Sequence, residues 1–283
     1  MNPALDQFLE QAASATIYDP GGAGEHATGE PVRVENAVSV RVGVDLGTAY
    51  TVVAVLDAQQ QPLAGVYRFA QVARDGLVVD FQGAIALLSE LKQCIEARLG
   101  FELQTAATTY PPGVPPAEVR ATRYVLEAAG FECRQVVDEP TAANAVLQIK
   151  NGAVVDIGGG TTGIAIVREG EVIYSADEAT GGTHFSLVIA GALGMSFEAA
   201  ELYKRNPQHH AQLFPLVQPV MEKVGTIIAR HVAAYEIETL YLVGGTACFD
   251  GIDRVIEEVT GLKTYIPPHP LFVTPFGVAM FDT

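Results

Sequence analysis

The sequence is poor in several residue types that mark particular classes of protein. It has no tryptophan, three cysteines (Cys94, Cys133 and Cys248), and 17 Lys and Arg against 33 Asp and Glu, a net charge of −16. Three widely separated cysteines form neither a disulfide framework nor a zinc site, and free thiols suit a reducing cytoplasm. An excess of negative charge opposes contact with phosphate backbones. We therefore expect a cytoplasmic protein that does not bind nucleic acid.

Long apolar runs are also absent. No stretch approaches the roughly 18 apolar residues that a membrane helix needs, and no basic segment precedes an apolar block at the N-terminus. We therefore expect neither a signal peptide nor a membrane partner. A composition that is 49% hydrophobic and 18% charged is typical of globular proteins. A chain of 283 residues has the length of about two domains.

The N-terminal region differs in character from the rest of the chain. Apolar residues recur at helical spacing within 1–16, and 18–35 is rich in glycine, proline and acidic residues, as linkers are. We therefore predict a helix and linker over 1–39. Two interpretations of the helix remain open: a frayed terminus, or a short amphipathic helix that docks on a partner.

From Val40 onward, strand and helix patterns alternate, which predicts an α/β fold. Helices are expected over 83–100, 115–131, 185–205 and 215–235, and a strand and helix after 266. The segment RNPQHHAQ, which contains His209 and His210, is expected to be a solvated loop.

Two segments repeat one pattern. VGVDLGTAYTVVAVLD (42–57) and AVVDIGGGTTGIAIVRE (153–169) each hold an apolar strand ending in Asp, an apolar residue and Gly, hydroxyls, and a second apolar strand. Asp45 and Asp156 are the matching positions, 111 residues apart. Such a repeat predicts two similar α/β halves that face each other.

Each repeated turn has the chemistry of a phosphate and magnesium site. Backbone N–H groups and hydroxyls of a glycine-rich turn can surround phosphate oxygens, and a carboxylate can hold Mg²⁺ directly or through water. Two such turns could hold a polyphosphate from opposite sides. One turn alone would be weak evidence, because glycine also serves any tight turn.

Other glycine motifs do not fit. Gly158, Gly160 and Gly163 match G-x-G-x-x-G, but a hairpin pattern follows where a dinucleotide fold needs a helix. The chain contains neither G-x-x-x-x-G-K-[ST] nor G-x-S-x-G, which removes the P-loop and hydrolase interpretations.

Two further segments suit a nucleoside, and each also has a plain structural interpretation. Gly244 and Gly245 end an apolar strand, where a flat base or ribose could approach the backbone, or where the chain simply turns. Glu201, Lys204 and Arg205 share one helical face, where they could contact a nucleoside or form a solvated ion-pair face.

Together these motifs resemble the actin–Hsp70–sugar kinase superfamily. The resemblance runs from about Val40 to Thr283. It rests on five segments: VGVDLGTAY (42–50) and VVDIGGGTTG (154–163) match the two phosphate motifs, DEPTAANA (138–145) the connecting motif, LVGGTACFDGI (242–252) the adenosine motif, and AELYKR (200–205) an Hsp70 segment that contacts ribose and adenine.

Longer blocks narrow the resemblance to the EutJ family of ethanolamine-utilisation proteins. These blocks are RDGLVVDFQGA (74–84), TTYPPG (108–113), VVDIGGGTTGIAIV (154–167), YSADEATGG (174–182) and LFVTPFGVAMF (271–281). The family resemblance implies a short Hsp70-like protein with a chaperone-like or assembly role toward ethanolamine-utilisation enzymes or shell proteins. It also implies association with a bacterial microcompartment.

The resemblance implies an actin-like ATPase fold of two ribonuclease H-like halves, 40–147 with 266–283 and 148–265, around a nucleotide cleft. ATP or ADP with Mg²⁺ would bind there. The phosphate residues would be Asp45, Gly47, Thr48 and Tyr50 from one half, and Asp156, Gly158, Gly159, Gly160, Thr161, Thr162, Gly181, Gly182 and Thr183 from the other. Glu201, Lys204, Arg205, Gly244 and Gly245 would hold the nucleoside, with Asp45 and Asp156 carrying Mg²⁺ through water.

Several departures from Hsp70 predict weak or absent hydrolysis. Gly163 stands where Hsp70 proteins have a second Asp, and Ala49 where they have a second hydroxyl. Only Arg68 and Arg74 are available near the expected place of the catalytic lysine. Glu139 remains to orient water, with Asp45 and Asp156 as the other catalytic candidates. The peptide-binding domain of Hsp70 proteins is also expected to be missing.

Three alternatives remain open. An actin-type filament or scaffold protein needs a head-to-tail interface. A small-molecule kinase needs a general-base Asp beside the γ-phosphate, for which no convincing segment is found. An adaptor that binds no nucleotide needs neither feature. The motifs also do not separate ATP from GTP.

Overall fold

The structure is a computed structural model that describes residues 2–19, 30–32, 39–74 and 77–283. The chain divides into two compact units, Met1–Leu147 with Phe272–Thr283, and Gln148–Leu271. The C-terminal return to the first unit therefore begins at 272, whereas we expected 266. Most of the expected linker, 18–35, lies outside the described residues.

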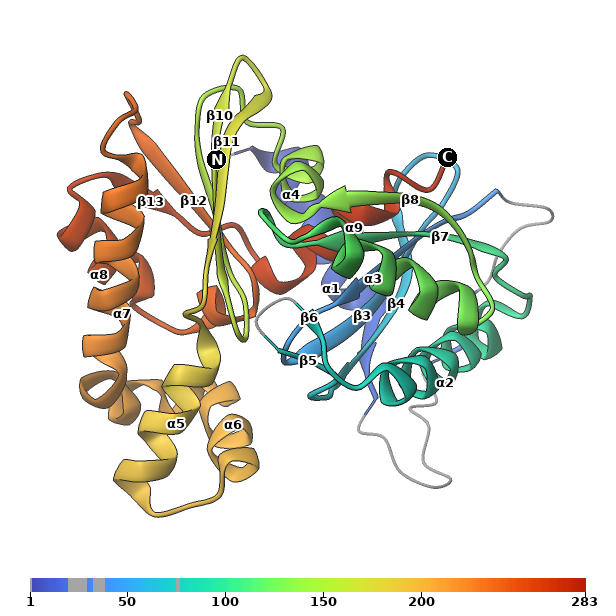
Figure 1. Ribbon diagram of the computed structural model, residues 1–283, viewed down its shortest axis with the longest axis horizontal. Coiled ribbons are helices and arrows are strands. Elements are labelled where there is room, and N and C mark those ends of the chain that lie inside the picture. The colour runs from blue at the N-terminus through green and yellow to red at the C-terminus, as the bar shows by residue number, and fades with distance from the viewer. Residues whose placement is uncertain (1, 20–29, 33–38, 75–76) are drawn as a thin grey trace. The chain divides into compact units, whose positions relative to one another are not determined.

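The first unit is built on a six-stranded sheet (Figure 1). In order across the sheet, the strands are β1 (Thr16–Tyr18), β4 (Pro62–Phe69), β3 (Tyr50–Leu56), β2 (Arg41–Leu46), β7 (Thr105–Tyr110) and β8 (Glu132–Asp138). Strands β4, β3 and β2 form an antiparallel meander, and β7 and β8 continue parallel to β2. A short hairpin pairs β5 (Ala73–Arg74) with β6 (Leu77–Val78).

Helices cover both faces of this sheet. They are α1 (Pro3–Ala15), α2 (Phe81–Leu99), α3 (Pro116–Ala128), α4 (Glu139–Leu147) and α9 (Val273–Ala279). Leu88 and Leu91 of α2 and Val125 of α3 share a core with β2 and β3. On the other face α9 lies so close to β2 that a Cβ at Gly43 would be 2.4 Å from the amide of Ala279.

The N-terminal segment is part of the first unit. Leu9 and Ala12 of α1 are buried, and β1 pairs with β4 as an edge strand. The fully buried Asp19 accepts a hydrogen bond of 2.5 Å from Arg68. The apolar stripe of α1 is therefore used inside its own unit, so the interpretations of a frayed terminus and a partner-docking helix are both wrong for α1.

The second unit repeats the topology of the first. Its strands, in order across the sheet, are β11 (Glu171–Glu178), β10 (Thr162–Arg168), β9 (Gly152–Ile157), β12 (Thr239–Val243) and β13 (Lys263–Tyr265). Again three strands form an antiparallel meander and two continue in parallel. The order matches β4-β3-β2-β7-β8 strand for strand. The internal repeat predicted from the two Asp-Gly segments is thus confirmed in the topology.

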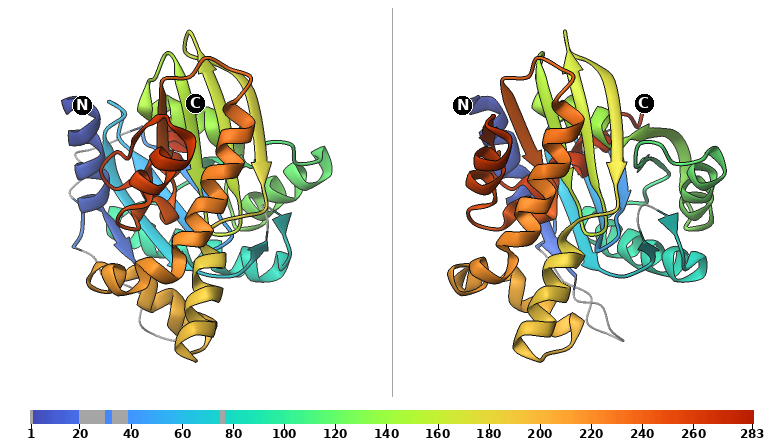
Figure 2. Two further views of the ribbon diagram at one scale, coloured as in Figure 1. Left: turned by 90° about the vertical axis from the view of Figure 1, so that its left-hand side faces the viewer. Right: turned by 60° about the vertical axis from the view of Figure 1, so that its left-hand side comes forward.

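The helices of the second unit are α5 (Gly182–Leu193), α6 (Phe197–Arg205), α7 (His210–Val232) and α8 (Ile252–Thr260), with short 3₁₀ turns η1 (Pro207–His209) and η2 (Gly245–Cys248). Helices α7 and α8 lie side by side over one face of the sheet (Figure 2). Val224, Ile228 and Ile256 fill the core beneath them.

Two element predictions were wrong. The expected single helix over 185–205 is two helices bent by 109°, because Gly194 ends α5 in a left-handed conformation and Ser196 caps α6. The expected C-terminal strand is absent from the described residues after 266, where the chain forms the 3₁₀ turn η3 (Pro270–Phe272) and α9. Among the described residues, no single helix has the length and apolarity to cross a membrane, although the bent α5–α6 pair does by composition.

Candidate functional site

The turn between β2 and β3 holds the first group of predicted phosphate residues. Asp45 lies near the end of β2, and Gly47 donates its N–H to the carbonyl of Tyr50 at 3.1 Å. This bond closes a tight turn around Thr48, which is partly exposed. The Tyr50 ring packs against Tyr67 and lies within an aromatic group of the first unit.

The turn between β9 and β10 has the same construction. Gly158 donates its N–H to the carbonyl of Thr161 at 2.9 Å, as Gly47 does to Tyr50. The register agrees as well: Asp156 pairs with Gly163 across the hairpin, and Asp45 pairs with Val52 at the equivalent position. The two loops are therefore structural copies.

Glu139 lies at the same sheet edge as Asp45. Strands β2, β7 and β8 are parallel, so their C-terminal ends share one edge. Asp138 ends β8, and its carboxylate accepts the N–H of Thr141 at 3.0 Å, which caps α4. Glu139 opens that helix and is partly exposed. The first unit thus brings Asp45, Gly47, Thr48 and Glu139 to one edge.

The start of α5 is bound to the second loop. Gly182 donates its N–H to the carbonyl of Gly158 at 2.9 Å, and Thr183 donates to Gly159 at 2.7 Å. Gly182 and Thr183 are predicted phosphate residues, and in this structure their amides hold the loop. Thr162 is fully buried and its hydroxyl donates to the carbonyl of Thr180 at 2.6 Å. Gly182, Thr183 and Thr162 therefore position the loop in this structure.

The strand-to-helix turn after β12 lies against the same loop. Gly244 has a left-handed φ of 88°, and a Cβ there would be 2.2 Å from Oδ1 of Asp156. Gly245 begins η2, and Thr246 donates its hydroxyl to the carbonyl of Gly158 at 2.7 Å. The second unit thus joins the second loop, the start of α5 and the glycine pair in one place.

Glu201 and Lys204 form a buried network. The Lys204 ammonium donates to Glu201 Oε2 at 2.6 Å, to Ser186 Oγ at 2.9 Å and to the carbonyl of Gly182 at 3.0 Å. Ser186 also donates to Glu201, at 2.6 Å. Burial lowers the pKa of Lys204, although the Glu201 carboxylate opposes this shift. The interpretation of a solvated face is wrong for these two residues, whereas Arg205 is partly exposed.

Arg68 is committed to a structural ion pair. It donates to Asp19 and to Glu90 within the first unit, at 2.5 Å each. Arg68 thus ties the N-terminal segment to β4 and α2, and is not placed as a counterpart of a catalytic lysine. Arg74 is exposed at the end of β5.

His210 is a residue whose role the sequence did not reveal. It is buried at the start of α7, stacks on Phe249 with ring centroids 4.1 Å apart, and lies 2.9 Å from the carbonyl of Lys204. Its Nδ1 accepts the N–H of Asp250 at 3.1 Å. The expectation of a solvated loop is therefore wrong for His210, which joins α6 to the turn before α8. Phe249 and Asp250 are too distant in sequence for any local pattern to show these contacts.

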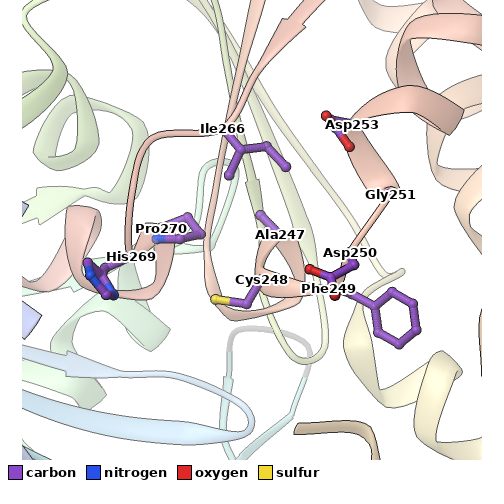
Figure 3. Close-up of a pocket in the computed structure, with 9 residues that line it drawn as sticks. All are labelled: Ala247, Cys248, Phe249, Asp250, Gly251, Asp253, Ile266, His269 and Pro270. Atoms are coloured by element: carbon purple, nitrogen blue, oxygen red, sulfur yellow. The ribbon is translucent and has the colours of Figure 1, made fainter. Parts of the chain in front are cut away.

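An open pocket of about 360 Å³ lies beside this turn, lined by η2, the start of α8 and the segment from Ile266 to Pro270 (Figure 3). Its polar side chains are Asp250, Asp253 and His269. Among the described residues, no group of three or more His, Cys, Asp or Glu side chains could hold a metal ion together.

Comparison with known proteins identifies the family. The chain is 46% identical over 239 residues to the ethanolamine utilization protein EutJ of Escherichia coli K12, which covers 84% of each chain. The chain belongs to the EutJ family. The crystal structure of EutJ from Carboxydothermus hydrogenoformans matches with a TM-score of 0.89 at 40% identity, over 99% of this chain and 98% of that one. The family model "Type IV pilus assembly protein PilM" also matches, over residues 118–272.

Wider comparisons confirm the actin-like α/β fold and Hsp70-like relatives. MreB 5 of Spiroplasma citri bound to AMPPNP matches with a TM-score of 0.67 at 18% identity, covering 88% of this chain and 97% of that one. A chaperone protein HscA homolog of Polynucleobacter asymbioticus is 27% identical over 79% of this chain and 44% of its own length. At these identities, the MreB match supports the fold alone.

Proposed function

We propose that this EutJ-family chain binds a magnesium nucleotide, ATP or ADP, through the two copied loops. The observation that carries the proposal is the matched pair of turns, in which Gly47 and Gly158 make the same hydrogen bond, each two residues after an aspartate. A repeat that served only to build the two sheets would need similar strands but not similar turns. Here the turns are alike as well: the first has the sequence Asp-x-Gly-Thr, and the second is rich in glycine and hydroxyl groups. The chemistry of both turns suits phosphate and Mg²⁺.

The residues of the two copied loops fit a magnesium nucleotide. Mg²⁺ keeps most of its waters and needs one or two carboxylates together with phosphate oxygens, so a site without a cluster of three acidic groups suits it. Asp45 and Asp156 would each orient water around the ion. Thr48 and the amides of Gly159, Gly160 and Thr161 would bind phosphate oxygens, and Gly244 and Gly245 would lie against the nucleoside.

Hydrolysis is proposed to be weak. Gly163 pairs with Asp156 in the hairpin and brings no second carboxylate, and Ala49 brings no hydroxyl. Arg68 is held by Asp19 and Glu90. Loss of one electrostatic group of this kind typically lowers a rate roughly 10²–10³-fold. Glu139 is left to orient the attacking water.

The proposed cellular role is that of a chaperone-like or assembly factor. The relatives named EutJ are ethanolamine utilization proteins, and a more distant relative is named a chaperone. We therefore infer partners among ethanolamine-utilisation enzymes or shell proteins, at a bacterial microcompartment. If ATP and ADP stabilise different conformations of the chain, a partner that binds one of these conformations more tightly would respond to the nucleotide.

Thermal unfolding with ligands tests nucleotide binding. ATP, ADP or GTP with Mg²⁺ at about 100 times its dissociation constant should add roughly 2.7 kcal/mol of stability. At the same ligand concentration Asp156→Asn should reduce the gain to roughly 0.4–1.4 kcal/mol. Glu258→Gln, an equal change of charge at an exposed position on α8, should preserve the full shift. Wild-type protein without a shift for any nucleotide would contradict the proposal and favour the adaptor alternative.

Co-purification tests the proposed partners separately. Tagged wild-type chain should retain ethanolamine-degrading enzymes or shell proteins from cells grown on ethanolamine, and retention should differ between ATP and ADP. Asp156→Asn should remove that difference. If retention were the same with either nucleotide, the chain would be a passive adaptor rather than a nucleotide-dependent factor.

A further inference from the structure

The α5–α6 hairpin exposes an unusual amount of apolar surface. Of the large apolar side chains exposed in the described part of the chain, half lie on these two helices: Leu187, Val188, Leu193 and Leu202. Leu202 is 61% exposed and Leu187 is 55% exposed. Helix α5 contains no Asp, Glu, Lys or Arg. Several exposed apolar side chains on two neighbouring helices are typical of an interaction site.

Helix α6 has a buried face and, beside it, a stripe of residues with an apolar side chain between two charged ones. Phe197, Ala200, Glu201 and Lys204 follow the helical repeat and face the interior of the unit, where Glu201 and Lys204 form their network. Glu198, Leu202 and Arg205 form a stripe beside that face, at spacings of four and three, with Arg205 partly exposed and next to Glu201. The stripe has an acidic end, an apolar centre and a basic end.

This stripe is complementary to itself. In a twofold-symmetric pair the same patch lies on both copies, so residue i contacts residue j and j contacts i. An axis through Leu202 would place Leu202 against Leu202 and Glu198 of each copy near Arg205 of the other. We propose that α5 and α6 form the interface of a twofold-symmetric dimer of this chain, with α6 running antiparallel to its copy.

A second copy fits this surface better than a membrane does. The net charge of −16 disfavours approach to anionic lipid headgroups. A second copy carries the same net charge, but the contact itself would join α5 helices that have no Asp, Glu, Lys or Arg and would pair Glu198 of each copy with Arg205 of the other. The arrangement closes on itself, so it limits assembly to two copies and differs from the head-to-tail contact of a filament.

Sedimentation of the full chain tests the proposal. Wild-type protein should be dimeric at micromolar concentration, and Leu187→Gln with Leu202→Gln should raise the dimer dissociation constant at least about tenfold. Val79→Gln, at a similarly exposed position in the first unit, should leave the dimer unchanged. A wild-type monomer, an open-ended polymer, or a dimer that resists the double substitution would overturn the proposal.

Charge reversal identifies the partner residue. Glu198→Arg and Arg205→Glu should each weaken the dimer by placing like charges together, and the double reversal should restore it. A structural defect from Arg205→Glu alone could not be repaired by reversing Glu198, so restoration requires the contact between copies. Failure of the double reversal to restore the dimer, or flotation of the wild-type chain with neutral lipid vesicles through Leu202, would overturn the proposed occupant.

Discussion

Asp156 lies so close to Gly244 that position 244 has no room for a side chain: a Cβ there would lie 2.2 Å from Oδ1 of the Asp156 carboxylate. The backbone at Gly244 is also left-handed, with φ of 88°, a region that L side chains rarely adopt. The position of the second aspartate thus depends on a glycine 88 residues later in the chain. This dependence links the second loop to the turn after β12.

Gly244→Ala should therefore destabilise the second unit strongly. The backbone at φ 88° and ψ 165°, a conformation adopted almost only by glycine, costs an alanine about 1–3 kcal/mol, and the overpacking costs about 1–3 kcal/mol more. Urea denaturation measures the loss. Gly261→Ala is the control for a positive φ without crowding, because Gly261 has φ of 69° in the left-handed helical region and a Cβ there would meet no atom within 4 Å. An equal loss in both variants would show that the contact with Asp156 adds nothing.

Lys204→Met should destabilise the chain by about 3–5 kcal/mol, because it breaks the buried ion pair in which the Lys204 ammonium lies 2.6 Å from the Glu201 carboxylate. Adding Glu201→Gln should restore part of the loss. Lys223→Met, at an exposed position on α7, should change stability by less than about 0.5 kcal/mol. Chemical denaturation of the three variants checks this account. If Lys204→Met behaved like Lys223→Met, Lys204 would have no structural role.

Arg68→Met should have a comparable effect in the first unit. The buried ion pair between Arg68 and the fully buried Asp19 would be broken, at a cost of about 3–5 kcal/mol, and β1 would separate more easily from β4. Hydrogen exchange at the amides of β1 measures that separation. Arg120→Met on α3 is the exposed control. Unchanged exchange at β1 would mean that the Arg68–Asp19 ion pair does not help to hold the strand against β4.

Glu178 should make stability depend on pH. Its pKa is lowered, first by the hydrogen bond with His231 and further by Arg230, against the effect of burial. A lowered folded-state pKa contributes stability above the ordinary pKa of Glu, and this contribution is lost as the pH falls through the folded value. Glu178→Gln should therefore be less stable than wild type at pH 7 but not at strongly acidic pH.

Melting temperatures from pH 7 to pH 3 check this dependence. Glu171→Gln, on the same strand and exposed, is the control and should track the wild type at every pH. The difference at pH 7 should be modest, because the Glu178 carboxylate is partly exposed and solvent screens the pair. A Glu178→Gln curve parallel to wild type over the whole range would contradict the linkage.

Local sequence patterns were sufficient for the repeated part of the fold. The alternation of apolar residues on both sides of Gly47 and Gly158 predicted two hairpins, and the structure has them with matching register. The C-terminal end of a helix could also be predicted where a glycine follows its last turn, as Gly100 does. These features depend on residues that are close together in the chain, so a local sequence pattern is enough to predict them.

Features that depend on distant residues were not predictable. His210 is buried because Phe249, some 40 residues away, offers a ring to stack on. Lys204 is buried because α5 folds back over α6 and supplies Ser186 and the Gly182 carbonyl. The helix break at Gly194 did have a local signal, a glycine followed two residues later by a capping serine, but the apolar periodicity of both helices masked it.

Calorimetric titration of ATP into the wild-type chain, with and without Mg²⁺, tests the central claim most directly. The two-loop account predicts magnesium-dependent binding that weakens roughly 10–100-fold in Asp45→Asn and again in Asp156→Asn, since each aspartate would orient water on the ion from its own unit. Glu258→Gln should bind as the wild type does. Wild-type binding that ignores both aspartates, or no binding of ATP at all, would contradict the account.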